Sequence, residues 1–380
     1  MILRPLVIIL LTTPGETDVS PCSAMGRFPE GDAVTELQAS THYLDGHFFN
    51  RPAARNPAGF EAMKEWMKGS AHTIPDAPIP VLTPNRADLE TSPVSGLRIT
   101  WIGHSTSLVQ IDGAVFLIDP VWSKRSSPVS VIGPKRFFEA PIPIDALPRI
   151  DAVLISHDHY DHLDKRTVQT LAKLNLRFVV PLGVDARLKG FGVRENQIES
   201  LDWWQRTRIR NITITATPAR HFSGRGFRDR NKTLWAGFAL AGDAHRVYYT
   251  GDTGMFPGFV EIGEKLGPFD ATLVEIGAYN RLWADMHLGP EQAVQAVRNA
   301  NGGLLIPVHW ATFNLAMHSW VEPAERLMVA AKQSDVPFVI PQPGQSIDPM
   351  TPPVPKRWWP DLPWQTVQEH PIIASGMASP

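Results

Sequence analysis

The chain has 380 residues, of which 36 are basic and 38 acidic, so its formal net charge is -2. A chain of this length can bury a large core in one domain with extensions, or in two or three smaller domains. The balanced charge and the lack of a long basic run exclude the electrostatic footprint of a nucleic-acid-binding protein. The single cysteine, Cys22, excludes an intrachain disulfide and a thiolate zinc site.

The first residues, MILRPLVIILLTTPGETDVSPCS, place one arginine before a short apolar run, as in a secretory signal. The run is too short to span a bilayer. VSPC also resembles a lipoprotein cleavage site, although Pro21 stands where a small residue is expected. Residues 1–22 are therefore a candidate signal-like segment, with a lipid anchor on Cys22 as the less favoured alternative. Cytoplasmic and membrane-associated locations both stay open.

Three regions differ in composition. Residues 1–95 are rich in proline and show little periodicity apart from a short helix predicted in PAGFEAMKEWMKG, so we expect an extension that wraps a core built elsewhere. Residues 96–345 alternate between strand and helix patterns and form the predicted main domain. Residues 346–380 form a tail rich in proline and tryptophan, whose tryptophans would cover the core or contact a membrane surface.

Within the main domain, LRITWIGHSTSLVQI and AVFLIDP are apolar, β-branched runs joined by Asp112-Gly113, a strong hairpin signal. After DAVLIS, the segment LDKRTVQTLAKL has helical spacing, with Asp164 as its candidate N-cap. GPEQAVQAVRNANGG predicts a helix that begins at Pro290. Further strands are predicted in FVVPL, ITITATPA, TLWAGFAL, HRVYYTG, DATLVEIG, LLIPVHW and PFVIP. This order predicts an α/β fold of two packed sheets with helices outside.

The densest run of ionisable residues is SHDHYDHLD, residues 156–164, directly after an apolar strand-like run. His157 and His159 are two residues apart, so in an extended turn both imidazoles can face one side and bind one cation. Asp161 and His162 follow and can serve a second cation. Four ligand-type residues at this spacing predict a metal site.

Three more candidate ligands, His221, Asp252 and His309, each follow an apolar strand-like run and are expected to project onto the same rim. Seven ligands shared by two ions, with one carboxylate bridging, leave room for a water-derived hydroxide between the metals. Two Zn²⁺ ions per chain are the expected cofactors, although imidazole and carboxylate also accept iron or manganese. The other histidines that we interpret as ordinary surface or core residues are His42, His47, His72, His245, His318 and His370.

HDHYDH, the later GDTG and the strand-final PVHW resemble the metallo-β-lactamase superfamily, whose fold is an αβ/βα sandwich with metals at its rim. The resemblance implies two zinc sites joined by a bridging Asp252. In this assignment the first zinc is bound by His157, His159 and His221, and the second by Asp161, His162 and His309. Antibiotic-hydrolysing members usually carry arginine after the motif aspartate and a cysteine ligand. His162 and the lack of that cysteine disfavour penicillin hydrolysis.

A narrower resemblance covers roughly residues 95–345, where WIGHSTSLVQIDGAVFLIDPVWS, EIGAYN, MHLGPEQAV and HWATF are similar to the N-acylphosphatidylethanolamine-hydrolysing phospholipase D group. It implies a dinuclear zinc phosphodiesterase that uses metal-bound hydroxide. The implied substrate is a phospholipid or a small phosphodiester. Peripheral membrane contact is implied with less support, because the N-terminal region shows no comparable match.

The same resemblance singles out His287, which would donate to a phosphate oxygen or to the leaving oxygen, next to the helix that begins at Pro290. His287 and Asp161 are therefore the candidate catalytic residues. His104, in GHST, would support the ligands from behind, and Asp164 would either orient a ligand histidine or cap its helix.

Two other classes of enzyme remain as alternatives. A lactonase or other acyl hydrolase needs only carbonyl polarisation, whereas a phosphodiesterase benefits from a donor such as His287. A di-iron redox protein could use a similar ligand set, but it would ordinarily need an electron partner, and the sequence has no Gly-rich nucleotide-binding region. A purely structural metal is disfavoured, since such a site would not need two ions.

Overall fold

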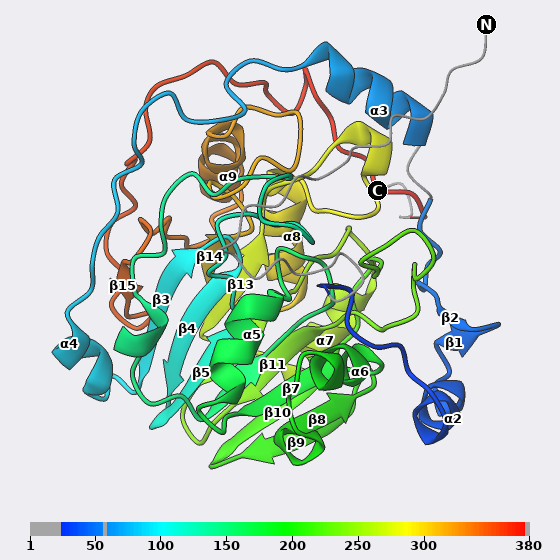
Figure 1. The fold of residues 1–380 in the computed structure, drawn as a ribbon. Coiled ribbons are helices and arrows are strands. Elements are labelled where there is room, and N and C mark those ends of the chain that lie inside the picture. The colour runs from blue at the N-terminus through cyan, green and yellow to red at the C-terminus, as the bar shows by residue number, and fades with distance from the viewer. Residues whose placement is uncertain (1–23, 56–58, 377–380) are drawn as a thin grey trace, which may run out of the picture.

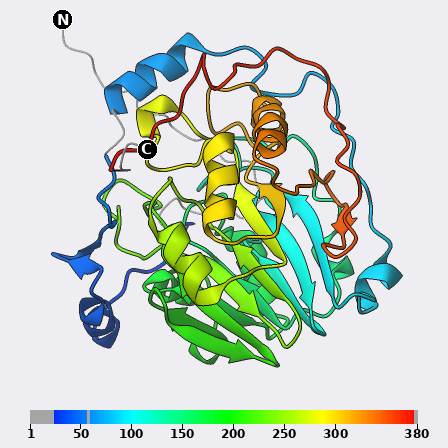
Figure 2. The ribbon, with the colours of Figure 1, turned by 180° about the vertical axis from the view of Figure 1, so that it is seen from behind.

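The computed structural model describes residues 24–55 and 59–376, and the signal-like segment with Cys22 lies outside this part of the chain. Two sheets pack face to face, with α5 and α6 outside one sheet in Figure 1 and α7, α8 and α9 outside the other in Figure 2. The predicted fold class, an αβ/βα sandwich, is therefore confirmed. The helices of the sandwich are α5 (Lys165–Ala172), α6 (Val184–Gly190), α7 (Gly258–Leu266), α8 (Pro290–Asn299) and α9 (Glu322–Gln333).

The first sheet has seven strands in the order β15-β3-β4-β5-β6-β7-β8. Pairing is antiparallel from β15 to β5 and parallel from β5 to β8. Its strands are β3 (Leu97–Gly103), β4 (Thr106–Ile111), β5 (Ala114–Ile118), β6 (Ala152–Leu154), β7 (Arg177–Pro181), β8 (Ile198–Leu201) and β15 (Ser346–Ile347).

The second sheet has six strands in the order β14-β13-β12-β11-β10-β9. Pairing is antiparallel from β9 to β12 and parallel from β12 to β14. Its strands are β9 (Arg206–Ile209), β10 (Ile212–Thr217), β11 (Gly237–Ala241), β12 (Arg246–Tyr249), β13 (Ala271–Glu275) and β14 (Leu304–Val308).

Both faces of the first sheet are buried, which explains why its strands read as continuous apolar runs. Val109 and Phe116 point into the core between the sheets, whereas their neighbours Leu108 and Leu117 pack outward with Val168 of α5. Because successive strand side chains alternate between the two faces, each strand contributes side chains to both hydrophobic layers. The sandwich is therefore a rigid base for the loops at its edge.

The predicted Asp112-Gly113 turn joins β4 to β5 with positive φ at both residues, and Asp164 caps α5 by accepting from the Arg166 amide. Two predictions were wrong in detail. The run predicted as one strand over 97–111 reverses at His104, whose φ of 52° allows the turn between β3 and β4. PFVIP is not a strand, because only Phe338 makes an isolated bridge, to Leu305.

The N-terminal extension runs along the outside of the sandwich (Figure 1). Its short elements are α2 (Asp32–Ala39), β1 (Tyr43–Leu44), β2 (His47–Phe48), the predicted helix α3 (Gly59–Lys68) and α4 (Arg86–Glu90). Three single-turn 3₁₀ helices span Ile144–Ala146, Glu195–Gln197 and Arg281–Trp283. Within residues 24–55 and 59–376, no helix combines the length and the apolar character needed to cross a membrane.

The tail completes the first sheet through β15 and covers the core with its tryptophans. The Trp358 ring lies 5.3 Å from that of Trp310, and the buried Trp359 donates its indole N–H to Glu325. Both extensions also meet at Arg220, whose guanidinium donates to the carbonyls of Ala53 (2.7 Å) and Ser375 (2.9 Å). Segments far apart in the sequence therefore converge beside His221.

Candidate metal centre

The candidate ligands all follow strand ends, as the sequence predicted, and they meet at one edge of the sandwich. The 156–164 loop connects β6 to α5, while His221 follows β10, Asp252 follows β12 and His309 follows β14. Parallel strands end at the same edge of a sheet, so loops from the two sheets face each other there. These loops place all seven residues in two groups of potential ligands, and a third group, formed by Asp252, Glu275, His287 and His309, overlaps both.

The first group consists of His157, His159, His221 and Asp252, whose candidate ligand atoms all lie within 4.8 Å of one another. The Nε2 atoms of His157 and His221 lie 2.8 and 3.3 Å from Nδ1 of His159. Both Nε2 atoms also lie 3.8 Å from Oδ2 of Asp252. Three imidazole nitrogens and one carboxylate oxygen thus converge on a single point.

The second group surrounds Asp161. Its Oδ2 atom lies 2.9 Å from Nε2 of His104, 3.3 Å from Nε2 of His309 and 3.5 Å from Nε2 of His162. The same Nε2 atoms of His162 and His309 lie 3.1 and 3.0 Å from Oδ2 of Asp252. Asp252 therefore stands between the two groups, in the position that the superfamily resemblance implies for a bridging ligand.

Several of these buried atoms have no hydrogen-bond partner among the described residues, including Nε2 of His162, Nε2 of His309 and Oδ1 of Asp252. The two histidine nitrogens approach Asp252 closely, but not in hydrogen-bonding geometry. An unpaired buried polar atom is costly, and the large majority of buried side-chain polar atoms in native proteins have a hydrogen-bond partner. Convergent imidazole nitrogens and carboxylate oxygens in this arrangement fit a divalent cation.

The protonation states differ between the two groups of candidate ligands. Burial lowers the pKa of His157 and His221 well below the ordinary histidine value, so both imidazoles are neutral. Burial would raise the pKa of Asp252, but His162 and His309 outweigh this and hold it well below its usual range. Burial would lower the pKa of His309, but the carboxylates of Asp252 and Asp161 outweigh it and raise this pKa to about 10. His309 therefore has to lose a proton when it binds a metal.

The motif loop is held from behind by Asp158, whose side chain points away from the ligands on either side of it. It accepts from the Gly224 amide (2.7 Å) and from Nε of Arg187 (3.1 Å). Arg187 in turn donates to Asp229 at 2.7 Å. The alternation that directs His157 and His159 to one side thus directs Asp158 into a buried ion-pair network.

Sequence reasoning missed two carboxylates that orient the histidines. Asp119 directly follows β5 and accepts from Nδ1 of His162 at 2.6 Å, as well as from Ser156 and the Tyr249 hydroxyl. Glu275 ends β13 and accepts from Nδ1 of His287 at 2.7 Å. Each stands at a strand end, so the signal used for the ligands could have found them. A carboxylate behind an imidazole fixes which nitrogen faces the site.

The other three predicted site residues, His287, His104 and Asp164, differ in how close they lie to the candidate ligands. His287 borders the centre, with its ring centroid 5.0 Å from that of His221 and 5.1 Å from that of His309. His104 touches Asp161 directly, and the structure groups it with the second set of potential ligands. Asp164, expected to orient a ligand histidine or to cap α5, caps α5, and its hydrogen bonds within the described chain go to amides and hydroxyls rather than to a histidine.

The backbone is strained where the ligands meet. The non-glycine residues His104, Asp119, Ala278, His309 and Ala311 all have positive φ, between 39° and 63°. Such conformations are uncommon outside glycine and cluster at functional sites. The His309 amide also donates to the His104 carbonyl at 3.0 Å, which couples the two strained turns.

A cavity of about 250 Å³ opens onto these groups. His159, Asp161, Asp252, His287 and His309 form its polar floor. Apolar side chains form its wall, namely Phe222, Ala278, Trp283, Met286 and Leu315. The site can therefore hold a polar reacting group against the floor and an apolar chain against the wall.

This fold and this site together define a metal-dependent hydrolase. Residues 114–310 match the family model described as a beta-lactamase superfamily domain. An uncharacterized protein of Mycobacterium tuberculosis is 47% identical over 336 residues, covering 86% of this chain and 89% of that protein. The chain belongs to the metallo-β-lactamase superfamily of metal-dependent hydrolases.

Within the superfamily, the chain is similar to the N-acyl-phosphatidylethanolamine-hydrolyzing phospholipase D 1 of Caenorhabditis elegans, with 37% identity over 265 residues, 66% of this chain and 74% of that protein. Among solved structures, the isothiocyanate hydrolase from Delia radicum gut bacteria superposes with a TM-score of 0.54 at 20% identity. This likeness covers 66% of this chain and 98% of that protein, and it shows the fold alone.

Proposed function

We propose that this chain is a dinuclear zinc hydrolase that cleaves a phosphodiester, preferably an N-acylphosphatidylethanolamine-type phospholipid. The observation that carries the proposal is the ring of histidines around Oδ2 of Asp252, beside which His287 is oriented by Glu275. The identity with the Caenorhabditis elegans phospholipase supports the substrate class. The metal count and the substrate are both open to direct test.

In this proposal, His157, His159 and His221 would hold one zinc ion, and Asp161, His162 and His309 would hold the other. Asp252 would be shared by both. When bound, the pair would supply Lewis acidity that activates a water and stabilises charge on the phosphoryl oxygens. The protein contributes the fixed positions of these ligands, which Asp119 and the Met286 carbonyl maintain through Nδ1 of His162 and His221.

The role proposed for His287 is proton donation. Since Glu275 accepts from Nδ1, the other ring nitrogen, Nε2, is available to a substrate in the cavity that His287 borders. In its imidazolium form, with Nδ1–H given to Glu275, His287 would donate its Nε2–H to a phosphoryl oxygen or to the departing alkoxide. Glu275 acts through His287 and is a positioning residue.

The apolar wall supports a lipid rather than a small polar diester. Phe222, Trp283, Met286 and Leu315 present aromatic and flexible side chains around the mouth. A cavity of about 250 Å³ holds a phosphoryl group and its immediate substituents, but not two full acyl chains. The chains of a phospholipid would therefore extend past the wall.

The substrate assignment can be tested by incubating the zinc-loaded protein with N-acylphosphatidylethanolamine, a lactone and a thioester. We expect release of N-acylethanolamine and phosphatidic acid, identified by mass spectrometry, at rates well above those for the other two substrates. Preferred hydrolysis of the lactone or the thioester would contradict the phosphodiesterase assignment while leaving the metal centre intact.

The proton-donor role can be tested with His287→Ala, and the exposed His47→Ala serves as a matched control. We expect His287→Ala to retain zinc and to lose about a hundredfold in kcat, the usual scale for a lost proton donor. The loss should be much smaller for a diester with an activated leaving group, and Glu275→Gln should show the same pattern more weakly. Loss of a zinc ion from His287→Ala would identify His287 as a ligand instead.

A further inference from the structure

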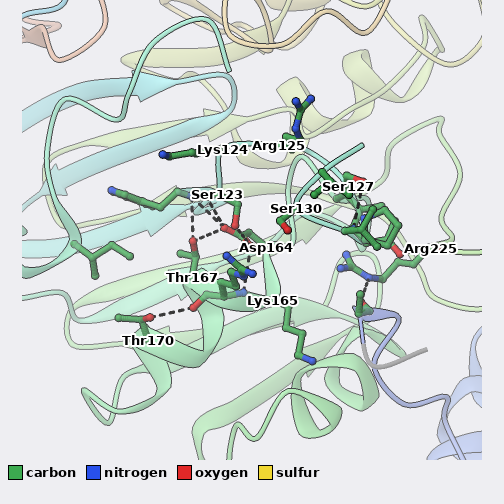
Figure 3. Close-up of a pocket in the computed structure, with 18 residues that line it drawn as sticks. Ser123, Lys124, Arg125, Ser127, Ser130, Asp164, Lys165, Thr167, Thr170 and Arg225 are labelled. Atoms are coloured by element: carbon green, nitrogen blue, oxygen red, sulfur yellow. Dashed lines mark hydrogen bonds between the residues drawn. The ribbon is translucent and has the colours of Figure 1, made fainter. Parts of the chain in front are cut away.

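A second and larger cavity, of about 560 Å³, lies between the loop that follows β5 and the first turns of α5 (Figure 3). It shares no lining residue with the cavity at the metal centre. Both cavities nevertheless border the 156–164 loop, since Tyr160 and Asp164 line this one while His159 and Asp161 line the other. We call it the α5 cavity.

The lining of the α5 cavity is strongly basic. Its five basic residues are Lys124, Arg125, Lys165, Arg166 and Arg225. Its one acidic residue is Asp164, so the lining carries a formal excess of four positive charges. The chain as a whole has a net charge of -2, so this concentration does not reflect a generally basic surface.

The single carboxylate already accepts several hydrogen bonds from neutral groups of the protein. Asp164 accepts from the amides of Trp122 (3.2 Å), Ser123 (2.9 Å) and Arg166 (3.2 Å). It also accepts from the hydroxyls of Ser123 (2.8 Å) and Thr167 (2.5 Å), and Figure 3 shows these bonds at the centre of the lining. Asp164 therefore has few acceptor positions left for hydrogen bonds from the surrounding cations, and its single charge balances only one of the five.

Four of the cations have no carboxylate within 4.0 Å among the described residues, namely Lys124, Arg125, Arg166 and Arg225. Arg225 is 6% exposed, and its guanidinium donates only to carbonyls, those of Ala24, Asp158 and Leu163. A buried cation without an ionic partner is costly unless an anion compensates it.

We propose that the α5 cavity binds the phosphate group of an anionic ligand. Arginine and lysine together suit a phosphate, which offers several acceptor oxygens and up to two negative charges. The side-chain hydroxyls of Ser127, Ser130 and Thr170 line the same space and can complete its hydrogen bonds. The volume exceeds that of a bare phosphate, so the ligand carries an organic substituent.

The phosphate can belong to a soluble metabolite or to a lipid headgroup. Val131, which lines the cavity, is 64% exposed, and the adjacent Ile132 is 66% exposed. Such a pair would contact acyl chains if the phosphate belonged to a membrane lipid. Replacing both residues by serine therefore separates the two sources.

The test compares phosphate binding by the zinc-loaded full chain and by a triple variant, Lys124→Gln with Arg125→Gln and Arg166→Gln. A control variant removes the same charge elsewhere through Arg206→Gln, Arg208→Gln and Lys332→Gln, which are exposed. Binding of inorganic phosphate and glycerol phosphate is measured by calorimetry. Hydrogen exchange of the 123–133 segment reports occupancy of the α5 cavity separately from the metal centre.

We expect phosphate to protect the 123–133 segment in the wild type and in the control, and the triple variant to weaken this binding at least tenfold. Equal weakening in the control, or no protection of the segment in the wild type by soluble phosphates or by vesicles containing phosphatidic acid, would overturn the proposal. If phosphatidic acid vesicles protect the segment and Val131→Ser with Ile132→Ser abolishes that protection, the ligand is a lipid. If soluble phosphates protect it equally in this double variant, the ligand is a soluble phosphate.

Discussion

Two buried aspartates near the same edge of the sandwich have opposite surroundings. Asp164, at the start of α5, accepts from three amides and two hydroxyls. Asp252, after β12, has an oxygen without any partner among the described residues and four imidazoles within 3.8 Å of the other. The chain can evidently satisfy a buried carboxylate from its own donors. At Asp252, where the unsatisfied oxygen stands among imidazoles, a metal cation is the partner that we propose.

The strongest test of this contrast is removal of metal from the centre around Asp252. We expect the purified protein to contain close to two transition-metal ions per chain and a chelator to abolish activity, with recovery on addition of zinc. Elemental analysis and activity measured on the same samples check this. Full activity in a metal-free sample would contradict the proposal that a metal ion is the missing partner of Asp252.

The next test replaces each of the two aspartates in a separate variant. Asp252→Asn removes the negative charge that both groups share, so we expect loss of at least one metal ion. Activity should fall by more than the roughly ten- to hundredfold that is typical when a residue that only orients a metal ligand is replaced. Asp164→Ala should retain both metals and instead lower the melting temperature, because loss of the N-cap side chain destabilises α5 by about 1 kcal/mol. Equal metal loss in the two variants would contradict the comparison.

Asp119 lies between these extremes, since it is satisfied by protein donors and also orients His162. We expect Asp119→Asn to weaken zinc binding by about ten- to hundredfold while both sites can still be filled at high zinc. A competitive chelator titration measures this affinity. An unchanged affinity would show that packing alone orients His162.

The smallest expected effect is the pH dependence of zinc binding. In the metal-free protein the pKa of His309 is about 10, so its imidazole is protonated at neutral pH and metal binding must displace that proton. The apparent zinc affinity should therefore rise as the pH rises from about 7 towards 10. Calorimetry in buffers of different ionisation enthalpy counts the released protons, and no release at pH 7 would show that His309 stays outside the coordination sphere.

Much of this arrangement could be predicted from the sequence, because strand ends after apolar runs were visible at His221, Asp252 and His309. The HxHxDH spacing in the 156–164 loop is specific enough to indicate both groups from the amino-acid sequence alone. The turn at His104 could not be predicted in the same way, because the polar residues between β3 and β4 are flanked by apolar residues on both sides.

Asp119 and Glu275 show a different limit of prediction from the sequence. Both follow the strand-end pattern, yet a carboxylate that orients a histidine and one that binds a metal have the same sequence signature. The α5 cavity was hidden for a further reason. Its cations come from residues 124–125, 165–166 and 225, and only tertiary folding brings them together.

The meeting of both terminal regions at Arg220 has a consequence for biosynthesis. The backbone of His221 is fixed by Asn50, and its neighbour Arg220 is bonded to Ser375, one of the last described residues. A ribosome makes Ser375 more than 150 residues after His221. During translation His221 therefore lacks part of its support until the tail has been synthesised. Truncation shortly before Ser375 would remove these bonds to Arg220 and loosen the support of its neighbour His221.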